Sequence, residues 1–564
     1  MPANNPLGFA PADWLVAFLT AAFILGVFIW SPRLKRTFTI LAGRTRWCMA
    51  LLWLLPILLR LLLLPHRPVP TPAIYDEFSH LLVADTLLHG RLANPPHPFP
   101  EFFETFFELQ RPTYSSIYPL GQGIVLAVGR LISGVPWTGV LIITGALCST
   151  CYWMLRAWVR PSWALLGGLL AVIEFGPLSQ WMNSYWGGAL AATGGCLVFG
   201  SLPRLRERWR NRDASLLGIG FGVHMVCRQF ESLLLFLAIV LFFLPLLLRP
   251  SERTKVLRAS MVALAAVFPI IVLILLQNRA VTHNWVMLPE QLSQYQYGVP
   301  TSLTIQQNPT PHVPLTPQQE LDYKAQALMH GPDTDTLSKF LLRLEYRVRY
   351  YRFFFLPPLY IALIAFFFSL RDRRLLWVVA TLLIFALGTN LFPYLLVHYL
   401  AAVTCLFVLV SIVGLQQLNR LRIRETSVGR EVVRVLVLLC FAEFTVWYGL
   451  HLFESPAVYP VLRYETWDSI GHVSERRAGV NRQLATIPGQ LLVFVHYSPR
   501  HVYQDEWVWN SADIDASRIV YARDRGQAED EKLIRYYPDR KVMLLEPDDF
   551  PPRISPLSRE EERR

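Results

Sequence analysis

The stretch ASLLGIGFGVHMVCRQFESLLLFLAIVLFFLPLLL (Ala214–Leu248) is mostly apolar, but its middle carries the tetrapeptide RQFE (Arg228–Glu231). One continuous helix of this length would place two charged side chains within the hydrocarbon core of a membrane, which is energetically expensive. We therefore predict that the chain turns back at RQFE and that the stretch forms two short membrane spans.

The rest of the chain has the composition of a membrane protein. Of its 564 residues, 53% are hydrophobic and only 17% are charged, and apolar runs of about spanning length recur along it. We predict an α-helical polytopic membrane protein of about twelve spans: Trp14–Trp30, Trp47–Leu64, Trp137–Leu155, Trp163–Trp181, Trp186–Leu202, Ala214–Cys227, Leu233–Leu248, Ser260–Leu276, Phe353–Leu370, Leu375–Leu391, Leu400–Leu415 and Val435–Leu450.

The net charge of +12 comes largely from short arginine clusters between these runs. Such clusters mark cytoplasmic loops, so nucleic acid is not expected as a partner. All of them fall on one side if the chain turns at RQFE and if Tyr118–Ile132 lies on the outer surface as an interfacial or re-entrant helix. The clusters are Arg33/Lys35/Arg36/Arg44/Arg46, Arg156/Arg160, Arg204/Arg206/Arg208/Arg210/Arg212, Arg253/Lys255/Arg258, Arg371/Arg373/Arg374 and Arg420/Arg422/Arg424/Arg430/Arg434.

This orientation divides the chain into regions and gathers its polar segments on the extracytoplasmic face. We predict an N-terminal span with a basic loop (1–46), a membrane domain (47–451) with outer loops 65–136 and 277–352, a small α/β domain (452–550) and a disordered tail (551–564). The α/β domain is inferred from strand patterns alternating with helical ones. The strand patterns are Gln490–Tyr497, Arg518–Ala522 and Lys541–Glu546.

The first outer loop opens with AIYDEFSH (Ala73–His80), where Asp76 and Glu77 are adjacent. Asp76 and His80 are four residues apart and share one face of a helix. A carboxylate at the membrane surface can act as a general base towards a hydroxyl. The alternative is that the two acidic residues only stabilise the first turn of a helix.

Further polar and aromatic residues on the outer face are candidates for binding substrate. Tyrosine and tryptophan there could instead form an interfacial aromatic belt, Arg228 and Glu231 could neutralise each other, and the run RLEYRVRYYR (Arg343–Arg352) could be a solvated basic face or could hold an anionic lipid head group. The candidates are His80, Arg111, Tyr118, Gln122, Asn183, Tyr185, Trp186, Arg228, Glu231, Arg347, Arg349 and His398. No cofactor is firmly implied. A divalent metal has possible ligands in His80, His89 and His97, but their spacing matches no known ligand pattern.

The Asp-Glu pair in a first outer loop, the surface helix after it and the alternating basic loops resemble the GT-C class of membrane glycosyltransferases. Within that class, the chain is most similar to the protein O-mannosyltransferases and the lipid A aminoarabinose transferase group, over roughly Trp47 to Leu450. The resemblance implies a polyprenyl-phosphate sugar donor and transfer on the outer face with inversion. It further implies that Asp76 is the catalytic base and that Glu77 orients it or the substrate. Many members carry another acidic residue near the second outer turn, where this chain has Asn183 and Tyr185.

The predicted function is therefore an integral glycosyltransferase of the cell (inner) membrane, which moves a sugar to an acceptor hydroxyl or amine. Its partners are the lipid-linked donor, membrane lipids and an acceptor that the sequence does not identify. One alternative is a transporter or flippase with a soluble sensor domain, which should show internal repeats and polar groups at the bilayer midplane. A receptor or scaffold is a third candidate.

Overall fold

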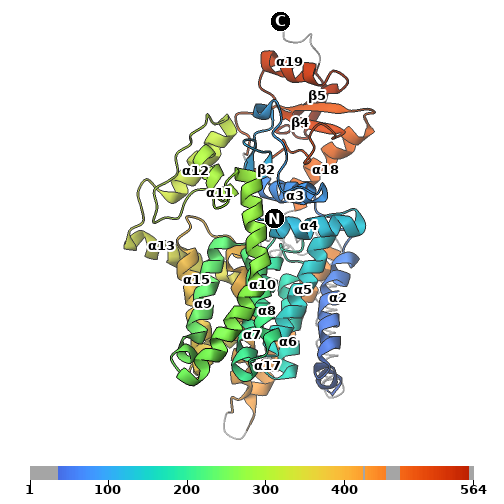
Figure 1. Cartoon of the computed structure of the whole chain (residues 1–564). Helices are drawn as coiled ribbons and strands as arrows, with labels where there is room; N and C mark the ends of the chain where they lie inside the picture. The colour runs from blue at the N-terminus through green and yellow to red at the C-terminus, as the bar shows by residue number, and fades with distance from the viewer. Residues whose placement is uncertain (1–35, 423–425, 453–470, 503, 558–564) are drawn as a thin grey trace.

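The computed structural model describes residues 36–422, 426–452, 471–502 and 504–557. Its lower part is a bundle of long helices that run side by side (Figure 1). They are α2 (Thr45–Leu62), α5 (Trp137–Leu155), α6 (Pro161–Phe175), α7 (Ala189–Arg208), α8 (Asn211–Met225), α9 (Gln229–Leu247), α10 (Pro250–Thr282), α14 (Tyr360–Phe366), α15 (Arg373–Thr389), α16 (Thr404–Asn419) and α17 (Val428–Leu452).

Among the described residues, six helices are long and apolar enough to cross a membrane, or seven if one bent pair is counted as a span. The predicted span Trp14–Trp30 lies outside the described residues. Each of the other predicted spans coincides with a helix, although several of these are short. The multi-pass helical architecture is therefore confirmed, whereas the count of twelve stays a prediction.

The chain reverses direction where the sequence predicted it. Helix α8 ends at Met225, α9 begins at Gln229, and the two helices pack against each other. Arg228 occupies the N-cap position of α9 with an extended backbone. The turn at RQFE keeps both charged side chains at one end of the bundle.

Two helices lie across the upper end of the bundle: α3 (Tyr75–Leu88) and α4 (Leu120–Ser133) (Figure 1). Helix α4 crosses α5 closely at Gly139, where an added Cβ would lie 1.9 Å from the carbonyl oxygen of Val125. Only glycine permits this approach. This orientation of α4 agrees with the expectation that Tyr118–Ile132 does not cross with the other helices, and its place at the membrane surface stays a prediction.

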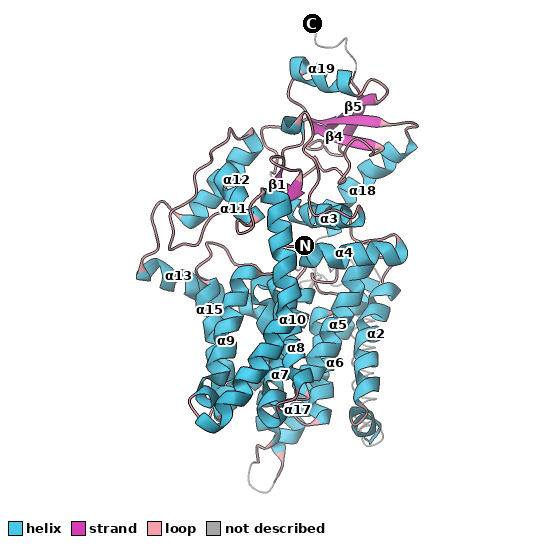
Figure 2. Cartoon of the chain, in the orientation of Figure 1, coloured by secondary structure: helices cyan, strands magenta, loops and turns pink. Residues whose placement is uncertain are grey.

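Above the bundle lie short elements from the two long outer loops and the C-terminal region (Figures 1 and 2). Loop 65–136 contributes the 3-10 helix η1 (Pro100–Phe102) and the antiparallel pair β1 (Glu108–Leu109) and β2 (Ser115–Ser116). Loop 277–352 forms α11 (Pro289–Tyr297), α12 (Pro317–His330), α13 (Leu337–Arg347) and most of the 3-10 helix η2 (Val348–Phe354).

The C-terminal residues form a four-stranded sheet in the order β4-β3-β5-β6. Strands β3 (Leu491–Val495), β4 (Ile519–Arg523) and β5 (Lys541–Glu546) are parallel, with Leu491 opposite both Ile519 and Lys541. They coincide with the three predicted strands, and helices α18 (Gly471–Thr486) and α19 (Gln527–Tyr536) accompany them. Strand β6 (Arg553–Pro556) adds an antiparallel edge.

The prediction of a disordered tail from residue 551 is wrong for residues 553–556, which form β6. This edge strand, RISP, is too short and polar to show a hydrophobic pattern, and it is recognisable only by its pairing with β5. Residues 558–564 of the predicted tail lie outside the described residues.

The sheet shares a hydrophobic core with the first outer loop. Phe494 and Val520 of the sheet pack with Leu82 of α3 and with Phe102 and Tyr114 of the loop that follows. The C-terminal sheet therefore supports α3, the helix that carries the Asp-Glu pair.

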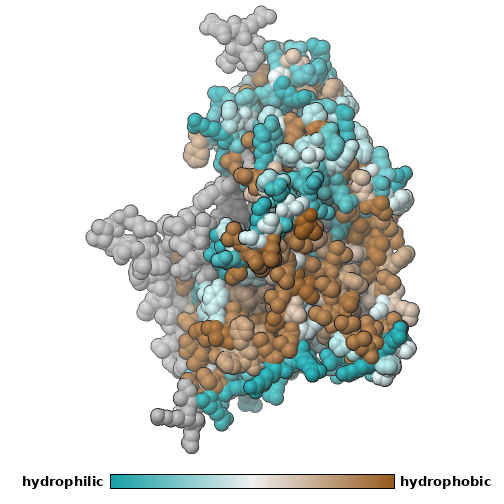
Figure 3. All heavy atoms as spheres, turned by 90° about the vertical axis from the view of Figure 1, so that its left-hand side faces the viewer, coloured by the Kyte–Doolittle hydropathy of each residue, from teal (hydrophilic) through white to brown (hydrophobic). Residues whose placement is uncertain are grey.

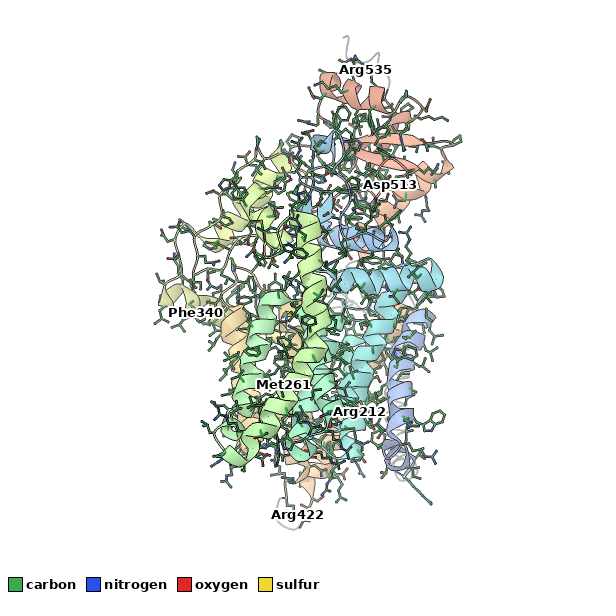
Figure 4. All side chains as sticks on the ribbon, viewed as in Figure 1. Arg212, Met261, Phe340, Arg422, Asp513 and Arg535 are labelled. Atoms are coloured by element: carbon green, nitrogen blue, oxygen red, sulfur yellow. The ribbon has the colours of Figure 1, made fainter. Side chains whose placement is uncertain are left out.

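Surface polarity divides the molecule into zones. On the face seen in Figure 3, a belt of apolar residues covers the bundle, and hydrophilic residues cover the lower end and much of the upper part. Arg212 and Arg422 lie at the lower end, whereas Asp513 and Arg535 lie at the opposite end (Figure 4). This distribution agrees with the prediction that the basic clusters and the outer segments face opposite sides of the membrane.

Candidate active site

A cavity of about 680 Å³ lies where the upper ends of α7 and α9 meet α3, α11 and α12. Its lining comes from segments far apart in the sequence, so the predicted convergence of polar residues occurs in three dimensions. Eight of the predicted site residues line it: Asp76, His80, Tyr118, Gln122, Trp186, Arg228, Glu231 and His398.

Asp76 lies in the first turn of α3 and faces this cavity. The hydroxyl of Tyr118 donates a hydrogen bond to its Oδ1. Burial raises the pKa of Asp76 to about 6, and the hydrogen bonds from Tyr118 and Trp186 together with the charge of Arg228 oppose a larger rise. At neutral pH the carboxylate is ionised, and it is more basic than an exposed aspartate.

Glu77 has a different role from its neighbour. Its Oε2 accepts hydrogen bonds from the backbone N–H groups of Ala73 (2.9 Å) and Ile74 (3.4 Å), and its Oε1 accepts one from Tyr185 (2.9 Å). Glu77 thus caps α3 and ties it to the turn at residues 182–185. It does not line the cavity, so its contacts are those of the helix-capping alternative, and its role in orienting Asp76 or the substrate stays a prediction.

His80 lies one helical turn beyond Asp76. Its ring stacks on that of Tyr118, with 4.3 Å between the centroids. Burial, assisted by the charge of Arg228, lowers the pKa of His80 to about 3, so the imidazole is neutral. Its Nδ1 is buried and has no hydrogen-bond partner among the described residues. The ring can therefore hold Tyr118 in place without adding a positive charge next to Asp76.

Arg228 and Glu231 face the cavity from the turn between α8 and α9. The guanidinium Cζ of Arg228 lies 4.7 Å from the ring centroid of Tyr399. No ion pair joins Arg228 to Glu231, and Glu231 Oε1 is buried without a hydrogen-bond partner within the described part of the chain. Arg228 therefore remains able to bind an anionic group in the cavity.

Three predicted residues have structural partners around the turn at residues 182–185 and in the first outer loop. Asn183 Oδ1 accepts a hydrogen bond of 2.6 Å from Nε of Arg60, a buried arginine in the last turn of α2. The Tyr185 hydroxyl donates to the carbonyl oxygen of Pro70. Arg111 has a side chain that is 68% exposed and pairs with Glu101 at 2.9 Å. None of the three lines the cavity, so the structure does not bring them together with Asp76, and their part in substrate binding stays a prediction.

The two predicted arginines of the run RLEYRVRYYR are also outside the cavity. Arg347 is buried and donates to the carbonyl oxygens of Thr389 (3.0 Å) and Phe392 (2.6 Å), so it anchors backbone rather than a ligand. Arg349 is exposed, and its guanidinium lies over the ring of Tyr346 at 3.6 Å from the centroid.

The sequence reasoning missed one wall of the cavity, which α11 and α12 supply. Glu290 and Gln294 come from α11, and Asp322 and Gln326 come from α12. Gln326 Nε2 donates to Asp322 Oδ2 at 3.0 Å, and burial, assisted by the charge of Asp76, raises the pKa of Asp322 to about 7. In the sequence, the only sign of this wall is that each helix carries an acidic residue and a glutamine four positions apart. Such pairs are common in surface helices.

The described residues contain no group of three or more His, Cys, Asp or Glu side chains placed to hold a metal ion. In particular, His97 is held by the Tyr537 hydroxyl and His89 by the carbonyl oxygen of Asp85, away from His80. These residues do not fit a metal site.

No family model matches the chain, and no curated protein matches its sequence. Among solved structures, the chain is similar to ArnT from Cupriavidus metallidurans in the apo state, with 11% identity, 89% of this chain and 93% of that chain covered, and a TM-score of 0.49. The same protein bound to undecaprenyl phosphate matches with 12% identity, coverages of 88% and 92%, and a TM-score of 0.49.

An Archaeoglobus fulgidus oligosaccharyltransferase tethered with an acceptor peptide also matches, with 12% identity, 80% of this chain and 62% of that chain covered, and a TM-score of 0.41. Both matched proteins are GT-C glycosyltransferases. The activity of this chain is inferred below from its own cavity residues.

The assignment of Glu77 as a positioning residue generates a prediction. In Glu77→Gln, one acceptor oxygen is replaced by an NH₂ group that opposes a backbone N–H, and we expect a loss of about 1–3 kcal/mol in the free energy of unfolding. Thermal unfolding of the purified protein in detergent measures this loss. Glu101→Gln, which alters an exposed carboxylate, is the matched control. Equal unfolding temperatures for the two variants would contradict the positioning role.

Proposed function

We propose that this protein is an integral membrane glycosyltransferase that moves a sugar from a polyprenyl-phosphate donor to an acceptor hydroxyl or amine, with Asp76 as general base. One observation carries the proposal: a buried carboxylate, Asp76, and an arginine with no ion-pair partner among the described residues, Arg228, face one cavity at the upper end of the helix bundle. These are the two groups that transfer from a lipid phosphate needs.

Asp76 has the properties of the base. As the acceptor oxygen or nitrogen attacks the anomeric carbon, Asp76 takes its proton, and the bond from that carbon to the phosphate oxygen breaks with its electron pair leaving on the phosphate. Attack from the face opposite the phosphate inverts the anomeric configuration. A pKa of about 6 suits this step, because the group is ionised near neutral pH yet basic enough to accept a proton.

Arg228 has the properties of the group that stabilises the departing phosphate. Lipid phosphate is already a good leaving group, so the site requires a positive charge more than a strong acid. Of the arginines proposed from the sequence for this role, Arg228 lines the cavity, whereas Arg111, Arg347 and Arg349 do not. The charge of Arg228 also opposes the rise in the pKa of Asp76, which helps to keep the base ionised.

The remaining cavity wall suits a ligand with many hydroxyl groups. Side-chain amides both donate and accept hydrogen bonds, and a sugar presents hydroxyls that do the same. Seven glutamines line the cavity: Gln122, Gln229, Gln291, Gln294, Gln306, Gln326 and Gln504. A polyprenyl chain attached to such a sugar could remain in the apolar belt below while the phosphate reaches Arg228 (Figure 3).

The proposed setting is the cell (inner) membrane with the cavity on the extracytoplasmic face. The support is the charge bias, because basic residues such as Arg212 and Arg422 lie at the end of the bundle opposite the cavity (Figure 4). A transporter would place its polar residues near the bilayer midplane. Here the polar lining lies at one end of the bundle, which favours the transferase.

The base role of Asp76 is tested by Asp76→Asn. We expect transfer of radiolabelled sugar from polyprenyl phosphate to endogenous acceptors in membranes to fall by about 100-fold or more, because asparagine accepts the Tyr118 hydrogen bond but takes no proton. Asp513→Asn, at an exposed carboxylate far from the cavity, is the matched control and should retain full transfer. Unchanged transfer in Asp76→Asn would remove Asp76 from the base role.

The pH dependence follows from the raised pKa of Asp76. The base works only when it is deprotonated, so kcat/KM, which reports the free enzyme, should be half-maximal near pH 6, where the pKa lies. It should fall with each further decrease in pH and level off above neutrality. Initial rates measured from pH 4.5 to 8.5 with donor well below saturation check this profile. A flat profile, or a rate that rises on acidification, is the contrary result.

The phosphate role of Arg228 is tested by Arg228→Gln. We expect this variant to lower the turnover number by about 100-fold, because the leaving phosphate loses its charge partner. Arg111→Gln removes an arginine of the same outer face that lies outside the cavity and should leave turnover near the unmodified value. Equal effects of the two substitutions would show that the position of Arg228 carries no special role.

A further inference from the structure

Helix α13 (Leu337–Arg347, LSKFLLRLEYR) turns its apolar side away from the protein. Leu337 is 74% exposed, Leu341 is 53% exposed, and Val348, which follows the helix, is 64% exposed. At 100° per residue these three side chains fall on one face of the helix. A helix exposed to water usually turns its apolar side inward, against the protein. The outward apolar face of α13 therefore needs a partner that covers it.

Two arginines of α13 face inward and are fixed to the end of a membrane helix. Arg343 Nε donates to the carbonyl oxygen of Asn390 at 3.0 Å, and its guanidinium pairs with Asp335. Arg347 donates to the carbonyl oxygen of Thr389, the last residue of α15. Basic groups stabilise the carboxyl end of a helix. These two arginines therefore face the protein, whereas Leu337 and Leu341 face outward, and Lys339 and Glu345 are exposed as well.

The position of α13 identifies the surface that its leucines meet. The segment Leu337–Phe354 is bent by 112° relative to Pro357–Ser369, the apolar helices that follow it. Helix α13 therefore runs across the bundle axis, beside the upper ends of α9 and α15 (Figure 1), and Phe340 marks its place there in Figure 4. On this side of the molecule, the apolar belt reaches up to the level of α13 (Figure 3).

We propose that α13 is an interfacial helix whose outward face of Leu337, Leu341 and Val348 rests among the acyl chains at the edge of the bilayer. Continuity with the apolar belt and the orientation across the bundle favour a lipid surface over a protein partner. Exposed Lys339 of α13 and Arg349 of the adjoining η2, the latter stacked on Tyr346, can reach lipid head groups, as basic and aromatic residues commonly do at this depth.

This contact would also position one wall of the cavity. The backbone N–H of Asp335 donates to the carbonyl oxygen of Thr304 at 2.8 Å, and Arg343 Nη2 donates to Thr304 Oγ1 at 3.2 Å. Thr304 directly follows Thr301–Leu303, which line the cavity. A helix seated on the bilayer thus holds the cavity wall through two hydrogen bonds to one residue. The lipid contact itself does not depend on the transferase activity.

Site-directed fluorescence tests the proposal on the full chain in proteoliposomes. Leu341→Cys carries a polarity-sensitive thiol label on the proposed lipid face. The matched control, Lys339→Cys, lies on the opposite side of the same helix, and unmodified protein gives the background from the seven native cysteines. Both positions are exposed, so neither substitution should disturb folding.

The label at position 341 should emit at shorter wavelength than the label at position 339. It should be quenched by lipids with brominated acyl chains, whereas the label at 339 should be quenched by iodide in the buffer. Iodide quenching at 341 without lipid quenching would overturn the proposal, since the face would then be in water. Protection of position 341 from both quenchers would also overturn it, because a protein would then cover the face.

Discussion

The cost of placing a charge in hydrocarbon is the constraint on which the rest of this structure depends. It forces the chain to reverse at RQFE, and the reversal leaves Arg228 and Glu231 at one end of the bundle instead of within it. The same constraint keeps α3 and α4 across the end of the bundle and gathers the acidic and amide side chains above it. A polar cavity directly above an apolar bundle is the consequence.

The adjacent residues Asp76 and Glu77 of α3 have different roles in the site. Glu77 directs its carboxylate to three backbone N–H groups and so fixes the start of the helix against the turn at residues 182–185. Asp76 is thereby presented to the cavity, where burial raises its pKa to about 6. The carboxylate of Glu77, which is held by backbone N–H groups, gives rigidity, and that of Asp76, which lines the cavity, gives basicity. Both depend on the C-terminal sheet that supports α3 from above.

Much of the fold could be predicted from the sequence because its signals are local. The run Trp137–Leu155 and the strand KVMLLE coincide with α5 and β5, since apolar runs and buried strands carry their own pattern. The RISP strand (β6) could not be predicted, because its sequence has no strand pattern of its own and it forms only by pairing with β5. In the site, Asp76 and Arg228 stood out as charges beside apolar runs. Asp322 did not, because its burial is created by tertiary packing of a helix with a polar sequence.

The direct test of the central claim is the location of a bound donor lipid. Electron cryo-microscopy of the full chain in lipid nanodiscs with polyprenyl phosphate would show the position of the phosphate. The account predicts phosphate density in the cavity, in contact with the Arg228 guanidinium and on the same side of the membrane as Asp76. Phosphate density among the arginine clusters at the opposite end of the bundle, with an empty cavity, would contradict it.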